Sequence, residues 1–179
     1  MWLALLAVLL PAPAFAEWKV QAISNTGADQ PVTFASTPLN GANQTITATP
    51  ASPWSLSDAR GTGAAWTATV SATAPTSAAG TVETTARTIS VGNLDVSAGT
   101  VTAETGSDAI TNITGASSLA LSGSAQTLIS SSGESKGTYT FSPSIGLLVP
   151  ANAYRSNYSG AVGSTALNAY VSTLTLSIS

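Results

Sequence analysis

The sequence predicts an all-β protein, more specifically an antiparallel β-sandwich with long Ser/Thr/Gly-rich loops. Apolar and polar residues alternate with a period of two in several short segments, as they do in strands that bury one face. Turn residues such as Asn40-Gly41 and Ser132-Gly133 separate these segments. Residues that favour helices, such as Glu, Lys and Arg, are scarce, because charged residues make up only 7% of the chain.

Each alternating segment is interpreted as a strand. In chain order the predicted strands cover 18–22, 32–34, 45–49, 66–72, 88–92, 138–142 and 170–179. The last of them has the clearest pattern, with one face formed by Tyr170, Leu174, Leu176 and Ile178. The segments 73–86 and 98–118 contain few large apolar residues, so we expect them to be long loops of the same domain. Strands of this length and spacing are typical of a β-sandwich.

The first sixteen residues are interpreted as a signal peptide. Met1 to Leu10 form an apolar run, and Ala14-Phe15-Ala16 supplies the small–x–small pattern that signal peptidase reads. The run is shorter than the roughly 20 apolar residues that a membrane-spanning helix needs. We therefore expect cleavage after Ala16, a secreted protein without a membrane span, and a single domain over residues 17–179. A retained N-terminal helix is the alternative.

Composition argues against several classes of function. The chain has five basic and eight acidic residues, a net charge of −3 and no basic cluster. Nucleic-acid binding is therefore disfavoured, because phosphate neutralisation needs several Lys or Arg on one face. A chain without Cys or His has neither the usual nucleophile–base pair nor the usual zinc ligands. The eight carboxylates show no paired spacing, and Asp95, Glu104 and Asp108 lack the spacing of a calcium loop. The sequence predicts no enzyme activity, no metal and no cofactor.

Two motifs give the chain a family resemblance. After Trp54-Ser55-Leu56, the first motif reads Asp58-Ala59-Arg60-Gly61-Thr62-Gly63, followed by Ala64-Ala65-Trp66. The second is the C-terminal segment, which reads Tyr170-Val171-Ser172-Thr173-Leu174-Thr175-Leu176-Ser177-Ile178. In their order and spacing these motifs resemble those of the WxL family of bacterial surface proteins, over most of residues 44–179. The chain departs from the family where Ala68 replaces the Leu after Trp66, and where Leu176 and Ile178 replace the C-terminal Trp and Leu.

The resemblance implies a β-sandwich that attaches non-covalently to peptidoglycan or another cell-wall glycan, often beside other surface proteins. It implies a protein located at the cell surface, in the cell wall. The candidate ligand-binding residues are Trp54, Asp58, Arg60 and Trp66.

The residues of the turn leave two interpretations open. In the first, Asp58 caps the backbone of the turn, Arg60 pairs with Asp58 or reaches a carbonyl, and Trp66 is a core residue. In the second, the same turn also contacts a glycan or a peptide. Trp54 follows Pro53 and is the better candidate for an exposed ring. Trp66 and Tyr170 are expected to lie mainly in the core.

A second function fits the low charge and the Ser/Thr-rich composition. The chain could be a structural subunit of a fimbrial, surface-layer or matrix assembly. In that case the strands that begin at Trp18 and at Tyr170 would each complete the sheet of a neighbouring subunit by terminal-strand exchange.

Overall fold

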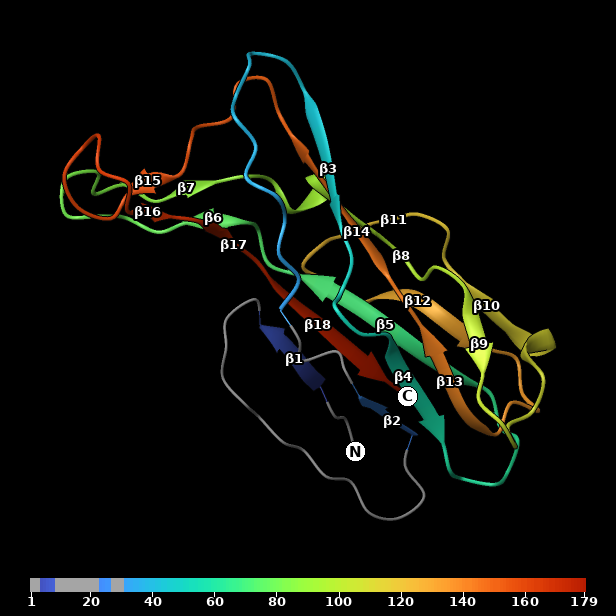
Figure 1. The fold of residues 1–179 in the computed structure, drawn as a ribbon. Helices are drawn as coiled ribbons and strands as arrows, with labels where there is room; N and C mark the ends of the chain where they lie inside the picture. Colours follow the sequence, from blue (N-terminus) through green and yellow to red (C-terminus); the bar gives the residue numbers. More distant parts are fainter. Residues whose placement is uncertain (1–3, 9–22, 27–30) are drawn as a thin grey trace.

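The computed structural model describes residues 4–8, 23–26 and 31–179, and it is an all-β sandwich of two layers (Figure 1). The first layer is a five-stranded antiparallel sheet with the order β1-β18-β5-β12-β10. Its strands are β1 (Ala4–Val8), β18 (Thr173–Ile178), β5 (Trp66–Ala72), β12 (Gln126–Ser131) and β10 (Ile113–Gly115). The predicted fold class is confirmed.

The second layer consists of two four-stranded sheets that lie end to end (Figure 1). One has the order β2-β4-β13-β9 and the other the order β11-β8-β14-β3. The strands are β2 (Ile23–Thr26), β3 (Gln44–Ala48), β4 (Trp54–Asp58), β8 (Leu94–Ser97), β9 (Val101–Ala103), β11 (Leu119–Ala120), β13 (Gly137–Phe141) and β14 (Ser144–Val149). Three chain segments therefore bend from one sheet into the other, as β3–β4, β8–β9 and β13–β14.

Gly99 allows the bend between β8 and β9. Its φ is +69°, in the left-handed region that residues with a side chain rarely adopt. A Cβ atom at this position would lie 2.4 Å from the carbonyl oxygen of Ser142, at the matching bend between β13 and β14. The two bends thus approach each other closely because residue 99 has no side chain.

The core lies between the two layers and follows the alternation read from the sequence. In β5 every second residue is buried, beginning with Trp66 and ending with Ala72, and the residues between them are half-buried. Leu174 and Leu176 continue this face in β18. In β12 the register shifts between Thr127 and Ile129, and this bulge buries two consecutive residues, Leu128 and Ile129.

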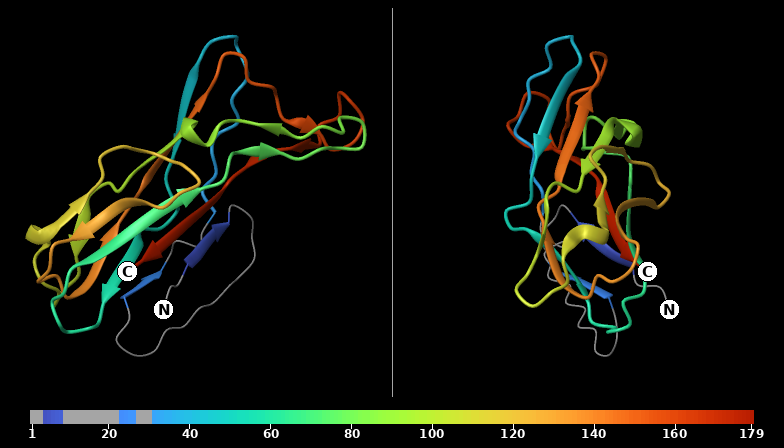
Figure 2. Two further views of the ribbon diagram at one scale, coloured as in Figure 1. Left: turned by 180° about the vertical axis from the view of Figure 1, so that it is seen from behind. Right: turned by 90° about the vertical axis from the view of Figure 1, so that its right-hand side faces the viewer.

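An arm projects from one end of the sandwich (Figure 2). It is built from residues 74–88 and 154–171, which form β6 (Thr76–Ser77), β7 (Arg87–Thr88), β15 (Asn157–Tyr158), β16 (Leu167–Asn168) and β17 (Tyr170–Val171). Asn157 is 1% exposed and joins the two halves of the arm. Its Nδ2 donates to the carbonyl oxygens of Ala78 at 3.0 Å and Thr85 at 2.8 Å, and its backbone N–H donates to Oγ of Ser77 at 2.9 Å.

Some local predictions were wrong. The segment 98–118, predicted as a loop, contains β9, β10 and the short 3-10 helix η2 (Ile110–Asn112). Its strands are only three residues long each, and their apolar residues Val101, Ala103 and Ile113 are partly buried against the core. The segment 32–34 is not a strand, although Val32 is buried.

Before β8, β7 ends at Thr88 and the 3-10 helix η1 (Val91–Asn93) follows, so the strand predicted over 88–92 forms only at its first residue. Residues 4–8 form a strand, so the alternative of an N-terminal helix is wrong for them. The proposed cleavage site after Ala16 and the strand predicted over 18–22 lie outside the described residues. Within the part of the chain that the structure describes, no helix has the length and hydropathy to cross a membrane.

Candidate functional site

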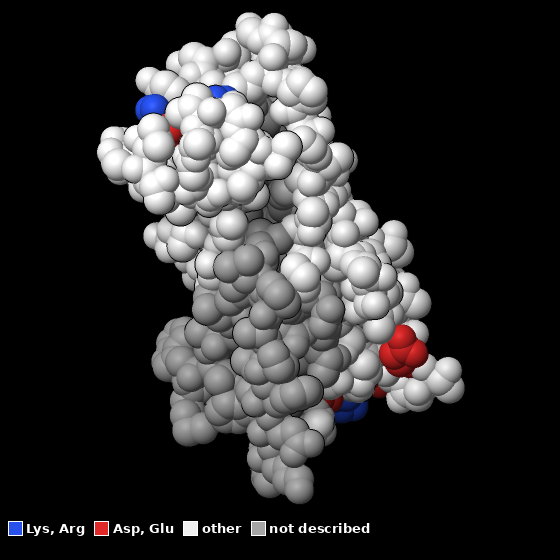
Figure 3. All heavy atoms as spheres, turned by 60° about the vertical axis from the view of Figure 1, so that its left-hand side comes forward, with Lys and Arg blue, Asp and Glu red and all other residues white. Residues whose placement is uncertain are grey.

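Most of the charged side chains that the structure describes gather at two ends of the molecule (Figure 3). One group lies around the Gly-rich turn after β4, which we call the turn end, and consists of Asp58, Arg60, Asp108, Glu134 and Lys136. The other group lies on the arm and consists of Glu83, Arg87 and Arg155. Three of the candidate residues predicted from the sequence, Asp58, Arg60 and Trp66, belong to the turn end.

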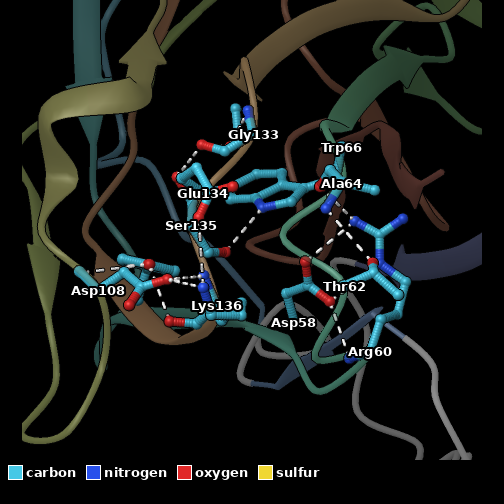
Figure 4. Close-up of polar contacts among 12 residues, drawn as sticks. Asp58, Arg60, Thr62, Ala64, Trp66, Asp108, Gly133, Glu134, Ser135 and Lys136 are labelled. Atoms are coloured by element: carbon cyan, nitrogen blue, oxygen red, sulfur yellow. Dashed lines mark hydrogen bonds and ion pairs between the residues drawn. The ribbon is translucent and has the colours of Figure 1, made fainter.

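Asp58, the last residue of β4, closes the turn that follows it (Figure 4). Its Oδ1 accepts hydrogen bonds from the backbone N–H of Arg60 at 3.0 Å and from Nε of Arg60 at 2.9 Å, and its Oδ2 accepts one from Nη2 at 2.9 Å. The same Nη2 donates to the carbonyl oxygen of Ala64 at 2.9 Å. Gly61 and Gly63 supply φ values of 69° and 65°. The turn is therefore held by its own side chains, as in the first interpretation.

These contacts fix the charges of Asp58 and Arg60. Burial acts to raise the pKa of Asp58, because only 4% of this residue is exposed. The hydrogen bonds and positive charge of Arg60, together with the charge of Lys136, outweigh burial and hold the pKa of Asp58 below its usual value. The hydrogen bond to Asp58 also raises the pKa of Arg60. The two residues form a fixed ion pair, and the Asp58 side chain, which is 2% exposed, has little capacity left for a ligand.

Trp66 and the loop after β12 complete the turn end. Trp66 is 2% exposed, its ring centroid lies 6.2 Å from that of Tyr139, and its Nε1 donates to the carbonyl oxygen of Ser135 at 3.3 Å. The neighbouring Lys136 bonds to Asp108 twice, through its backbone N–H at 2.9 Å and through Nζ at 2.9 Å. The backbone bond is the main reason why the pKa of Asp108 is lowered. Trp66 is a core residue, as predicted.

Trp54 does not belong to this group, and the prediction of an exposed ring is wrong. It is 1% exposed and packs edge-to-face on Phe141, with ring centroids 5.8 Å apart. It shares the buried face of β4 with Leu56 and Asp58, and the alternation of the strand overrides the preceding Pro53. At about 3.3 Å per residue, Trp54 lies about 13 Å from Asp58 along the strand. The structure thus brings together Asp58, Arg60 and Trp66, but not Trp54.

The arm carries two Arg–Tyr stacks that sequence reasoning missed. The guanidinium carbon of Arg87 lies 4.1 Å from the ring centroid of Tyr154, and that of Arg155 lies 4.1 Å from the ring centroid of Tyr158. Nη1 and Nη2 of Arg155 also donate to the two carboxylate oxygens of Glu83, at 2.9 and 2.6 Å. These bonds lower the pKa of Glu83, as does the hydrogen bond that the carboxylate accepts from the backbone N–H of Tyr158.

Tyr154 is the most accessible large ring among the described residues. It is 62% exposed, whereas Tyr170 beside it is half-buried and donates its hydroxyl to the carbonyl oxygen of Tyr154 at 2.9 Å. Tyr170 packs against the core, and burial raises its pKa. The sequence contains only a short signal for this site. Tyr154-Arg155 places an aromatic residue next to a basic one, in a chain with five basic residues.

A largely apolar cavity of about 950 Å³ opens at the base of the arm. Its inner wall includes Trp54 and Leu174, and Tyr154 and Arg155 belong to its lining on the arm side. Cavities of this size are typical of ligand-binding sites. The arm thus combines an exposed ring, fixed positive charges and an adjacent hollow.

Carboxylates do not assemble into a metal centre in the described part of the chain, where no three acidic residues cluster at ligating distance. Asp95 lies on β8, away from the turn between β9 and η2 that carries Glu104 and Asp108. The chain matches no protein-family model, and searches of the curated proteins and of the solved structures also give no match.

Proposed function

We propose that this chain is a secreted, non-catalytic surface protein that attaches non-covalently to the bacterial cell wall, binding peptidoglycan or another wall glycan through its arm. The observation that carries this proposal is the Tyr154 ring, which is 62% exposed and has the Arg87 guanidinium over its face at 4.1 Å. A ring held in this way presents a flat apolar surface beside fixed hydrogen-bond donors, the combination that a sugar or a peptide stem can use.

The arm suits recognition better than the turn end does. At the turn end, the Asp58 carboxylate and the Trp66 indole N–H are bonded within the protein, and the Arg60 side chain, which bonds to Asp58 and Ala64, is only 23% exposed. On the arm, Arg155 is 46% exposed at its side chain while Glu83 holds it in place. An ordered but accessible guanidinium loses less side-chain entropy on binding than a free one.

The sequence supports the cell-wall assignment independently of the arm. The signal-peptide pattern over 1–16 favours secretion, and the two motifs resemble those of the WxL family. Charged residues make up only 7% of the chain, so attachment would depend on stacking and hydrogen bonds more than on charge.

The test is sedimentation of the secreted protein with purified peptidoglycan sacculi at low and at high salt. We expect the protein to sediment at both, because stacking and hydrogen bonds are less sensitive to salt than ion pairs. Tyr154→Ala should weaken binding about tenfold, the loss expected of a central aromatic contact. Tyr154→Phe keeps the ring and should bind like the wild type. Wild-type protein that stays in the supernatant would refute wall binding. If Tyr154→Ala binds as tightly as Tyr154→Phe, the ring of Tyr154 is not part of the binding site.

A further inference from the structure

Along its outer edge, β18 is hydrogen-bonded to β1 alone among the described strands. The two strands pair antiparallel, from Ala4↔Ser177 to Val8↔Thr173. Strand β1 lies within the segment that carries the signal-peptide pattern, so cleavage after Ala16 would remove it. The mature chain would then have β18 as the edge strand of its first layer.

As an edge, β18 lacks the usual protection against pairing with another chain. It is six residues long and contains no charged residue, proline or glycine. Among the other edge strands, β9, β10 and β11 are much shorter, at three, three and two residues, and β2 and β3 have four and five. A long uncharged edge with free N–H and C=O groups is a template for strand addition.

We propose that, after removal of residues 1–16, β18 pairs antiparallel with β18 of a second copy, so that the mature protein is a two-fold symmetric dimer with one sheet continuous across both copies. This dimer does not depend on wall binding. The same strand edge is used by both copies, so the assembly closes at two and does not grow into a fibre.

The backbone of β18 is arranged for this pairing. Thr73 donates its N–H to the carbonyl oxygen of Thr173 at 2.9 Å, and Thr67 and Ser179 exchange two backbone hydrogen bonds at 2.8 and 3.0 Å. The odd-numbered residues of β18 therefore direct their N–H and C=O groups toward β5. The groups of Leu174 and Leu176 point the other way, toward the edge.

The side chains are also self-complementary in one register. With Thr175 opposite Thr175 of the second copy, Leu174 of each copy faces Leu176 of the other. Leu174 and Leu176 point into the core, so the apolar face of the sheet would continue across the dimer. The free backbone N–H and C=O groups of Leu174 and Leu176 would form the hydrogen bonds between the two copies. The two Thr175 residues would lie directly opposite each other as a close pair without backbone hydrogen bonds.

Edge pairing is favoured here over exchange of the C-terminal strand. The two hydrogen bonds between Thr67 and Ser179 extend the pairing of this segment with β5 beyond the end of β18. Buried Leu174 and Leu176 would also have to leave the core before β18 could enter a neighbour. A dimer made by addition keeps all of these contacts and adds new ones.

The experiment uses the secreted protein, with an intact mass to establish its N-terminus and analytical ultracentrifugation over a wide concentration range to measure association. We expect a monomer–dimer equilibrium. Thr175→Glu and Thr175→Lys should each weaken the dimer about fivefold or more, because like charges would meet directly opposite each other at about 5 Å. Mixing the two variants should restore the dimer through a Glu–Lys pair.

Ser71→Glu is the matched control. Ser71 lies opposite Thr175 on β5, so it carries the same charge on the same face one strand further from the edge. Across the dimer the two Ser71 positions would be three strand spacings apart, about 14 Å, beyond the screening length of about 10 Å at 0.1 M salt. This variant should dimerise like the wild type. A wild-type monomer at every concentration, an open-ended polymer, an intact mass that retains residues 1–16, or no recovery on mixing would each overturn the proposal.

Discussion

Replacing Asp58 by Asn tests whether the ion pair at the turn end stabilises the fold. The substitution keeps the shape of the side chain but removes the charge that accepts three hydrogen bonds from Arg60. Hydrogen bonds to charged groups contribute about 1.5–3 kcal/mol each when buried. The side chain of Arg60 is 23% exposed and can regain water, so we expect a total loss of only about 2 kcal/mol of unfolding free energy.

For a domain of this size, about 2 kcal/mol corresponds to a fall in Tm of about 4–8 °C, which thermal unfolding followed by circular dichroism would resolve. Glu134→Gln is the control, because the Glu134 side chain is 78% exposed and its loss should change stability by less than about 0.5 kcal/mol. An Asp58→Asn variant with the Tm of the wild type would refute the reasoning.

The same pair predicts a pH dependence. The pKa of Asp58 is lowered in the folded protein, so its contribution is complete above the unfolded-state pKa of about 3.9 and is lost as pH falls through the folded-state pKa. The difference in Tm between the wild type and Asp58→Asn should therefore be full at neutral pH and shrink under acid conditions. A difference that stays constant into acid would show that Asp58 acts through packing and not through its charge.

Two further substitutions test the arm and the bend. Asn157→Ala removes the Nδ2 donor from the carbonyl of Thr85 and one of two donors from that of Ala78, which keeps Nδ2 of Asn168, so we expect a loss of about 1 kcal/mol and faster proteolysis within the arm; an unchanged cleavage rate would contradict this role. Gly99→Ala places a Cβ 2.4 Å from the Ser142 carbonyl at positive φ, which should cost about 2 kcal/mol or more in denaturant unfolding. Normal stability of that variant would mean that the bend is not tight.

Sequence periodicity predicted several of the strands that bury one face, but it missed β4 and β8, which also alternate between buried and half-buried residues. In β5, β13 and β18 the inward residues are those that the alternation selects, such as Trp66, Tyr139 and Leu174. The same rule applied to Trp54 would have placed it in the core with Leu56, but its position after Pro53 was given more weight. The arm strands β6, β15 and β16 escaped prediction because Asn157 and Ser77 hold this region by hydrogen bonds rather than by an apolar face.

The candidate site was predictable only in part. The spacing Asp58-Ala59-Arg60 indicated a self-capped turn, because a side chain can bond to the backbone two residues ahead, and this pair forms as the first interpretation expected. The Arg87–Tyr154 stack joins residues from different halves of the arm. Local patterns cannot reveal a contact of that kind, because it depends on how β7 and the chain after β14 are brought together.

The central claim is that the arm, and not the turn end, contacts the cell wall. The most direct measurement compares the binding of Tyr154→Ala and Lys136→Ala to isolated sacculi, with folding of both verified by circular dichroism. Tyr154 lies on the arm, and Lys136 lies at the turn end with 37% of its side chain exposed. We predict that Tyr154→Ala binds the sacculi about tenfold more weakly than the wild type, while Lys136→Ala binds with unchanged affinity. Release of Lys136→Ala with normal retention of Tyr154→Ala would contradict the claim.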